Sequence, residues 1–271
     1  MPKYKHPATS RLEKDLLIVI LLNVIGFLYA IVARNQYFGT IIYSSFAIGL
    51  PAMIYLSLRK KKNWLKIFVF SLIAGGMYGF LLEFFAEYNH IWDVPSPSFP
   101  YRLFGFLPAI DVVIGHMLMT AYTATFYEHF IDAKHLSRKI SLHHLLYGVI
   151  PVGLAIVILL SAFLINPELI KSSSYLYAYI GIAAIIPPIL YAFKKPIVFR
   201  NMAFTGVYFF FFYLALEVIG VNLSFWTFEK GTYIGYVHVF NAGFPFEEVI
   251  FWMGFYSSFL VFFYEKFIDN E

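Results

Sequence analysis

The chain contains no cysteine among its 271 residues, and only 13% of them are charged. Without cysteine, disulfide bonds, thiolate metal sites and thiol nucleophiles are excluded. The glycine-rich nucleotide motifs, the paired-histidine zinc motif and the serine nucleophile elbow are also missing. We therefore expect neither a cofactor nor a metal ion, and any chemistry would depend on acids, bases and aromatic rings.

Apolar residues are abundant instead. They make up 60% of the chain, and its mean hydropathy is +0.71, whereas a soluble domain is about 45–50% apolar and about 25% charged. A membrane-spanning helix needs ~20 apolar residues. Eight segments satisfy this requirement: 15–33, 37–58, 65–86, 106–130, 143–165, 175–193, 202–221 and 245–267. The sequence predicts an all-α integral membrane protein with about eight transmembrane helices.

The basic residues are unevenly divided between the two predicted sides of the membrane. Sixteen of the 20 lysines and arginines fall near the two termini or in the loops after the second, fourth and sixth spans. The other four are Arg34, Arg102, Lys171 and Lys230. Because cytoplasmic loops are enriched in Lys and Arg, both termini are predicted to be cytoplasmic, in the cell membrane. The same loops account for the pI near 9.0 without a nucleic-acid partner.

An internal repeat is the most informative pattern. The stretches "LEFFAEYNHIW" and "LEVIGVNLSFW" each place a tryptophan nine residues after a glutamate, so that Glu83 and Trp92 match Glu217 and Trp226. A tryptophan near the end of a span is also typical of an interface anchor. The glutamates could instead bond to loop backbone. Both readings remain open at this point.

Two further landmarks continue the repeat. "FLPAIDVVIGH" and "GFPFEEVIFWM" each carry an acid three residues after a proline, which matches Asp111 to Glu248, and "FYEHF" at 126–130 matches "FYEKF" at 263–267. Matched landmarks that recur in the same order indicate two tandem units. We predict two parallel four-helix repeats, 1–134 with a degenerate Pro-x-x-Asp motif and 135–271 with a Pro-x-Glu-Glu motif.

Face-to-face packing of the two halves would bring four acids together near the outer side of the membrane. These are Glu83, Asp111, Glu217 and Glu248. Crowded carboxyl groups in a low dielectric share protons, which favours a neutral carboxylic acid that donates a proton. Glu247 and Glu248 lie about 100° apart on a helix, so one of them faces the interior, and Glu248 is favoured. The alternative is a helix N-terminus stabilised by negative charge.

The second half resembles the lycopene cyclase domain of the small membrane type, found in bacterial, archaeal and fungal enzymes. The stretch "FWTFEKGTYIGYVHVFNAGFPFEEVIFWMGFYSSFLVFFYE" (225–265) carries the resemblance through its tryptophan, "GTYIG", the Pro-x-Glu-Glu signature and the terminal Tyr-Glu. The first half departs from this pattern, because Pro-Ala-Ile-Asp stands in place of the signature.

The resemblance implies carotenoid biosynthesis by an intramolecular lyase, an isomerase that closes polyene end groups into rings without net redox change. Glu248 or Glu247 would be the acid, and Glu217 and Glu83 the base or proton-sharing partners, with Asp111 as the shortened acid of the first half. The cation would be stabilised by ring faces of Trp226, Trp92, Phe251 and Trp252. The polyene would come from the bilayer, and a partner subunit or other carotenoid enzymes could associate.

Three rival functions remain open. A membrane transporter commonly combines repeats with midplane acids, and it would show interrupted helices with glycine at matched positions. A non-catalytic partner subunit fits the degenerate first half. An intramembrane protease of the Glu-Glu-x-x-x-Arg type shares the paired acids, but Trp252 stands where its arginine is needed.

Overall fold

The computed structural model describes residues 7–32, 49–59, 64–95, 102, 110–132, 140, 142–171 and 174–268. Helices account for most of these residues, and one short β-hairpin interrupts them. The class predicted from the sequence, an all-α chain rich in apolar helices, is therefore confirmed. Pro108 and the loop lysines Lys60, Lys61, Lys62, Lys134 and Lys139 lie outside the described residues.

The elements run in the order α1 (Pro7–Val32), α3 (Leu50–Arg59), α4 (Trp64–Phe70), η1 (Ser71–Met77), α5 (Tyr78–Tyr88), α6 (Ile110–Phe130), α7 (Leu142–Ile165), η3 (Pro167–Ile170), α8 (Leu176–Lys194), α9 (Pro196–Asn222), β1 (Tyr236–Val239), β2 (Ala242–Pro245), η4 (Glu248–Met253), α10 (Tyr256–Phe263) and η5 (Tyr264–Ile268). The segments η1, η4 and η5 are π-helical, and η3 is a 3₁₀ turn.

Five helices within the described ranges are long and apolar enough to cross a membrane. They are Arg11–Val32, Trp64–Tyr88, His143–Ile165, Leu176–Lys194 and Pro196–Asn222. Of the other three predicted spans, 37–58 and 106–130 begin outside the described residues, and 245–267 is divided among η4, α10 and η5. The chain thus has the helices of a membrane protein, and the count of eight spans stays a prediction.

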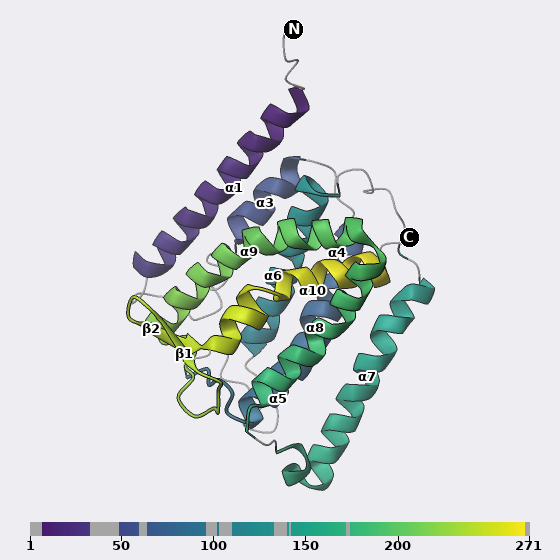
Figure 1. Cartoon of the computed structure of the whole chain (residues 1–271), viewed down its shortest axis with the longest axis vertical. Helices are drawn as coiled ribbons and strands as arrows, with labels where there is room; N and C mark the ends of the chain where they lie inside the picture. Colours follow the sequence, from purple (N-terminus) through teal and green to yellow (C-terminus); the bar gives the residue numbers. More distant parts are fainter. Residues whose placement is uncertain are drawn as a thin grey trace.

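Apolar side chains cover the outside of the peripheral helices. Figure 1 shows α1 and α7 at opposite edges of the molecule, with α9 and α10 between them. Leu17 on α1, Ile158 on α7 and Phe193 on α8 are each at least two-thirds exposed. An apolar surface of this kind is stable when lipid rather than water surrounds it.

The interior is built largely from aromatic rings. Tyr122, Phe209 and Tyr213 are completely buried where α6 meets α9. Phe70 and Tyr264 are buried in a second cluster around α10. The ring centroids of Tyr122 and Phe209 are 5.2 Å apart in an edge-to-face arrangement, which is favourable for aromatic pairs. Much of the aromatic content therefore serves to pack the helices.

Close backbone contact fixes how α6 lies against η1. A Cβ atom on Gly75 would come within 2.6 Å of the Cα atom of Met117 and 2.7 Å of the His116 carbonyl oxygen. Only glycine permits this approach. The contact holds α6, which carries Asp111 and His116, against the helix that leads into α5 and Glu83.

Candidate functional site

A cavity of about 110 Å³ is lined by most of the residues singled out from the sequence. Of the nine candidate acids and aromatic residues, seven line this cavity: Glu83, Trp92, Asp111, Glu217, Trp226, Glu248 and Trp252. The four acids among them are each at most 5% exposed. They come from α5, α6, α9 and η4. Four segments far apart in the sequence thus place carboxyl groups around one space.

Each of the two matched tryptophans donates a hydrogen bond to its matched glutamate. The Trp92 Nε1 atom lies 2.9 Å from Glu83 Oε2, and the Trp226 Nε1 atom lies 2.6 Å from Glu217 Oε1. The two indoles therefore orient the carboxyl groups as well as bordering the cavity. The interface-anchor alternative does not describe these contacts, because both ring nitrogens bond to buried acids.

The nine-residue spacing works because both helices end in the same way. After α5, the Ile91 amide donates to the Ala86 carbonyl, and His90 has a φ of 53°. After α9, the Phe225 amide donates to the Gly220 carbonyl, and Ser224 has a φ of 57°. This is the Schellman helix end. It turns each chain back along its own helix, so that the following tryptophan reaches the glutamate.

The two returning segments then pair with each other. Asp93 and Thr227, one residue beyond the tryptophans, exchange two backbone hydrogen bonds of 2.9 Å each. At Gly220 a Cβ atom would come within 2.1 Å of the Trp226 ring, so the absence of a side chain makes room for that indole. The bridge and this close contact hold both indoles over the cavity.

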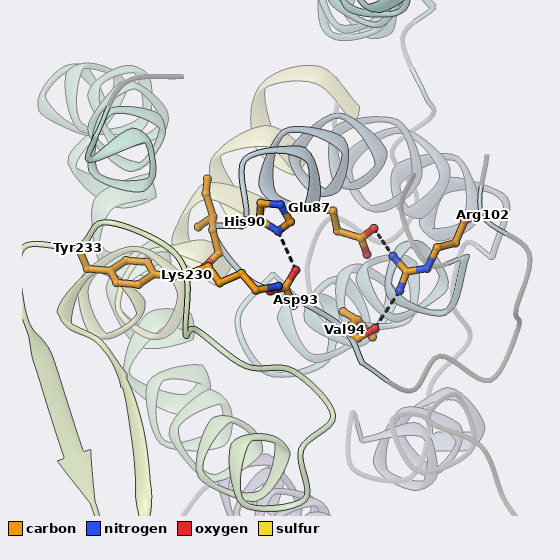
Figure 2. A network of polar contacts seen from close by, with 8 residues as sticks. Glu87, His90, Asp93, Val94, Arg102, Lys230 and Tyr233 are labelled. Carbon is orange, nitrogen blue, oxygen red and sulfur yellow. Dashed lines mark hydrogen bonds and ion pairs between the residues drawn. The ribbon is translucent and has the colours of Figure 1, made fainter. Parts of the chain in front are cut away.

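Polar contacts fix the loop that carries Trp92 (Figure 2). The Arg102 guanidinium donates to the Glu87 carboxylate at 2.7 Å and to the Val94 carbonyl at 2.8 Å. His90 and Lys230 each lie 3.1 Å from the Asp93 carboxylate. Burial raises the pKa of Asp93, but the hydrogen bonds from His90 and Lys230 and the charge of Lys230 outweigh it, so the pKa is below its ordinary value.

Glu247 and Glu248 are adjacent in sequence but have different surroundings. Glu248 lines the cavity, where the Tyr177 hydroxyl hydrogen-bonds to it. Glu247 is completely buried outside the cavity lining, and its Oε1 atom accepts a hydrogen bond of 2.7 Å from the Ile234 amide. Glu247 thus ties the loop before β1 to the start of η4, whereas Glu248 faces the other acids.

Two polar residues that line the cavity, His116 and Tyr177, were not assigned a role in the sequence analysis. The His116 Nε2 atom lies 2.9 Å from Glu83 Oε1, and its Nδ1 atom lies 3.2 Å from the Tyr256 hydroxyl. Tyr177 approaches from α8. In the sequence, the histidine is visible only as a polar residue within an apolar run. Nothing in the sequence distinguished Tyr177 from the other tyrosines.

Phe251 lies outside this cavity and lines a neighbouring one, with its ring centroid 6.0 Å from that of Tyr177. Within the described ranges, no three histidine or acidic side chains are grouped so as to hold a metal ion. Comparison of the chain with protein-family models, curated sequences and solved structures returns no match. Function must therefore be argued from the geometry of the site.

Proposed function

We propose that the chain is a membrane enzyme of carotenoid biosynthesis that cyclises polyene end groups by acid catalysis, in the manner of a lycopene β-cyclase. The observation that carries the proposal is the cavity itself. Four buried carboxyl groups and three indole rings surround one space inside a lipid-facing helix bundle. An acid starts such a reaction, a base ends it, and aromatic faces stabilise a carbocation between the two steps.

The reaction balances without a cofactor. Glu248 gives a proton to the terminal double bond of the polyene, which leaves a tertiary carbocation. The neighbouring double bond attacks this cation, forms one carbon–carbon bond and closes a six-membered ring. Glu83 or Glu217 then removes a ring proton to form the new double bond. Proton transfer among the carboxyl groups restores Glu248, so substrate and product are isomers.

The aromatic residues stabilise the carbocation that forms between protonation and deprotonation. Trp92, Trp226 and Trp252 border the space in which the charge develops, and a ring face within ~6 Å attracts a cation. The indole nitrogens of Trp92 and Trp226 already bond to carboxyl groups. These bonds hold the acids still and leave the ring faces to contact the substrate.

Two parallel four-helix repeats, 1–134 and 135–271, form the proposed architecture around the site. Support comes from matched contacts at both ends. Near the cavity, Asp93 pairs with its counterpart Thr227. At the far end, Tyr127 donates to Glu265 and Tyr264 donates to Glu128. Reciprocal contacts between matched positions are what a two-fold relation produces, and they favour an axis through both points.

The transporter alternative has no comparable support. Its expected glycine interruption coincides with η1, and there the close approach of Gly75 to Met117 accounts for the glycine. The corresponding part of the second half lies within the continuous helix α9. The partner-subunit and protease alternatives likewise gain no observation from the cavity.

The test is pigment analysis by chromatography in a lycopene-accumulating bacterium. The unaltered chain is expected to form cyclic carotene. Glu248→Gln should reduce conversion by at least about 10²-fold, the contribution typical of a general acid. Glu247→Gln is the matched control, because an amide oxygen still accepts from the Ile234 amide, and it should keep most of the conversion. Unchanged lycopene beside a well-inserted, unaltered chain would refute the proposal.

A further inference from the structure

A second, larger cavity adjoins the carboxyl-lined one. It measures about 340 Å³ and lies among η1, α5, α8, η4 and α10. Four residues line both cavities: Leu82, His116, Tyr177 and Trp252. All four lie at the boundary between the two spaces, and we call the three that have rings, His116, Tyr177 and Trp252, the neck. A long molecule could thus lie in both at once.

The chemistry of the second cavity differs from that of the first. Among the described residues that line it, none carries a carboxyl group, and all but those of the neck and two tyrosines are aliphatic or phenyl. Its size falls within the range of about 300–1,000 Å³ usual for ligand pockets. With so few polar groups, hydrogen bonds would fix little of a ligand's orientation. The lining suits a hydrocarbon.

The lining of the cavity includes an exposed position on α8. Leu81 and Phe85 border it on α5, and Ile180 and Ala184 border it on α8. Ala184 is exposed, whereas the first two are partly buried. At Gly181 a Cβ atom would come within 2.2 Å of the Phe251 ring, so the absence of a side chain there lets this ring pack against α8.

We propose that the second cavity binds the unreacted chain of a branched isoprenoid hydrocarbon, which arrives sideways from the bilayer between α5 and α8. Its end group passes the neck into the carboxyl-lined cavity. The inference rests on the proposed function for what happens to that end group, but the binding itself does not. It explains why the acid site is joined to a carboxyl-free space whose lining includes an exposed residue of α8, since a hydrocarbon gains nothing by passing through water.

Binding is tested by photolabelling, which requires no ring closure. The probe is a saturated isoprenoid hydrocarbon that carries one diazirine, added to the full chain in lipid nanodiscs and mapped by peptide mass spectrometry. Labels should concentrate in α5, in the first half of α8 and in η4. Excess unlabelled squalane should remove them. Labels spread over α1 and α7 as well, and insensitive to squalane, would overturn the inference.

A pair of variants sharpens the result. Ala184→Trp fills the gap and should reduce the squalane-sensitive labelling by about tenfold. Ala183→Trp is the control, since Ala183 is also exposed but lies about 100° away around α8. Equal labelling of the two variants would count against the site. Squalane-sensitive labelling without cyclic product would sustain the binding site and defeat the cyclase, and cyclic product with dispersed labelling would do the reverse.

Discussion

Individual acids in this chain are distinguished by their hydrogen-bond partners. Glu217 receives the indole N–H of Trp226. Glu83 receives the indole of Trp92 and also meets the imidazole of His116. The position matched to His116 is Met253, which has no hydrogen-bonding nitrogen. The two halves of the site therefore differ at Glu83, and this acid has the closer connection to a second proton-carrying group.

This difference leads to a prediction for His116→Met, which copies the other half. The change removes the contacts to Glu83 and Tyr256 and puts an apolar side chain of similar length in place of the imidazole. Cyclisation should fall by about 10²-fold, because a residue that orients a base carries part of its contribution. Pigment conversion per unit of purified protein is the measurement.

Non-additivity separates this role from a general loss of structure. The double variant His116→Met with Glu83→Gln should convert pigment as fast as the slower of the two single variants, because the two side chains act as a unit. If the rate loss of the double variant equals the product of the two single losses, the histidine acts independently of Glu83. An unchanged rate in His116→Met would show that the contact has no part in the reaction.

At the scale of elements, the ends of α5 and α9 do the positioning. Both use a non-glycine residue with positive φ, His90 and Ser224. A left-handed conformation costs an ordinary L-residue roughly 1–2 kcal/mol. His90 recovers part of this through its contact with Asp93. Ser224 is exposed, so it offers the cleaner test.

Ser224→Gly should stabilise the protein by about 1 kcal/mol, because glycine adopts positive φ without steric cost. Ser224→Val should destabilise it, since a branched Cβ is the least tolerant there. Thermal unfolding in detergent, followed by circular dichroism, measures both. Equal midpoints for the two variants would mean that the turn does not limit the stability of the helix end.

The sequence predicted the elements that repeat and missed those that do not. The matched Glu–Trp spacing foretold which side chains gather, because identical helix ends produce identical returns. The β1–β2 hairpin was missed, although it leads directly into Glu247 and Glu248. Its four-residue strands are short, and within them hydrophobic periodicity carries little signal. Tyr177 was missed because its position depends on how α8 packs against η4, which no local pattern encodes.

At the scale of the whole molecule, the two ends of the bundle carry different chemistry. One end has the carboxyl-lined cavity and the Asp93–Thr227 bridge. The other has the reciprocal tyrosine–glutamate contacts and Lys66, whose ammonium lies 3.6 Å from Glu128. Which end faces the cytoplasm decides the side of the membrane on which proton exchange with the site occurs. The distribution of basic residues predicts that the cavity end faces outward.

The absence of native cysteine makes this orientation directly measurable, because a single introduced thiol is the only target for a maleimide. Lys171 and Lys230 are 65% and 59% exposed at the side chain and lie beyond the cavity end of their helices. Lys194 is exposed at the opposite end of α8.

In intact cells, a membrane-impermeant maleimide should label Lys171→Cys and Lys230→Cys, and it should label Lys194→Cys only after permeabilisation. Since Lys230 contacts Asp93 in the loop that carries Trp92, its labelling also reports the side on which the carboxyl cavity lies. The reverse pattern would place both termini outside and the acids near the cytoplasm, where protons for the first step would come from the cell interior.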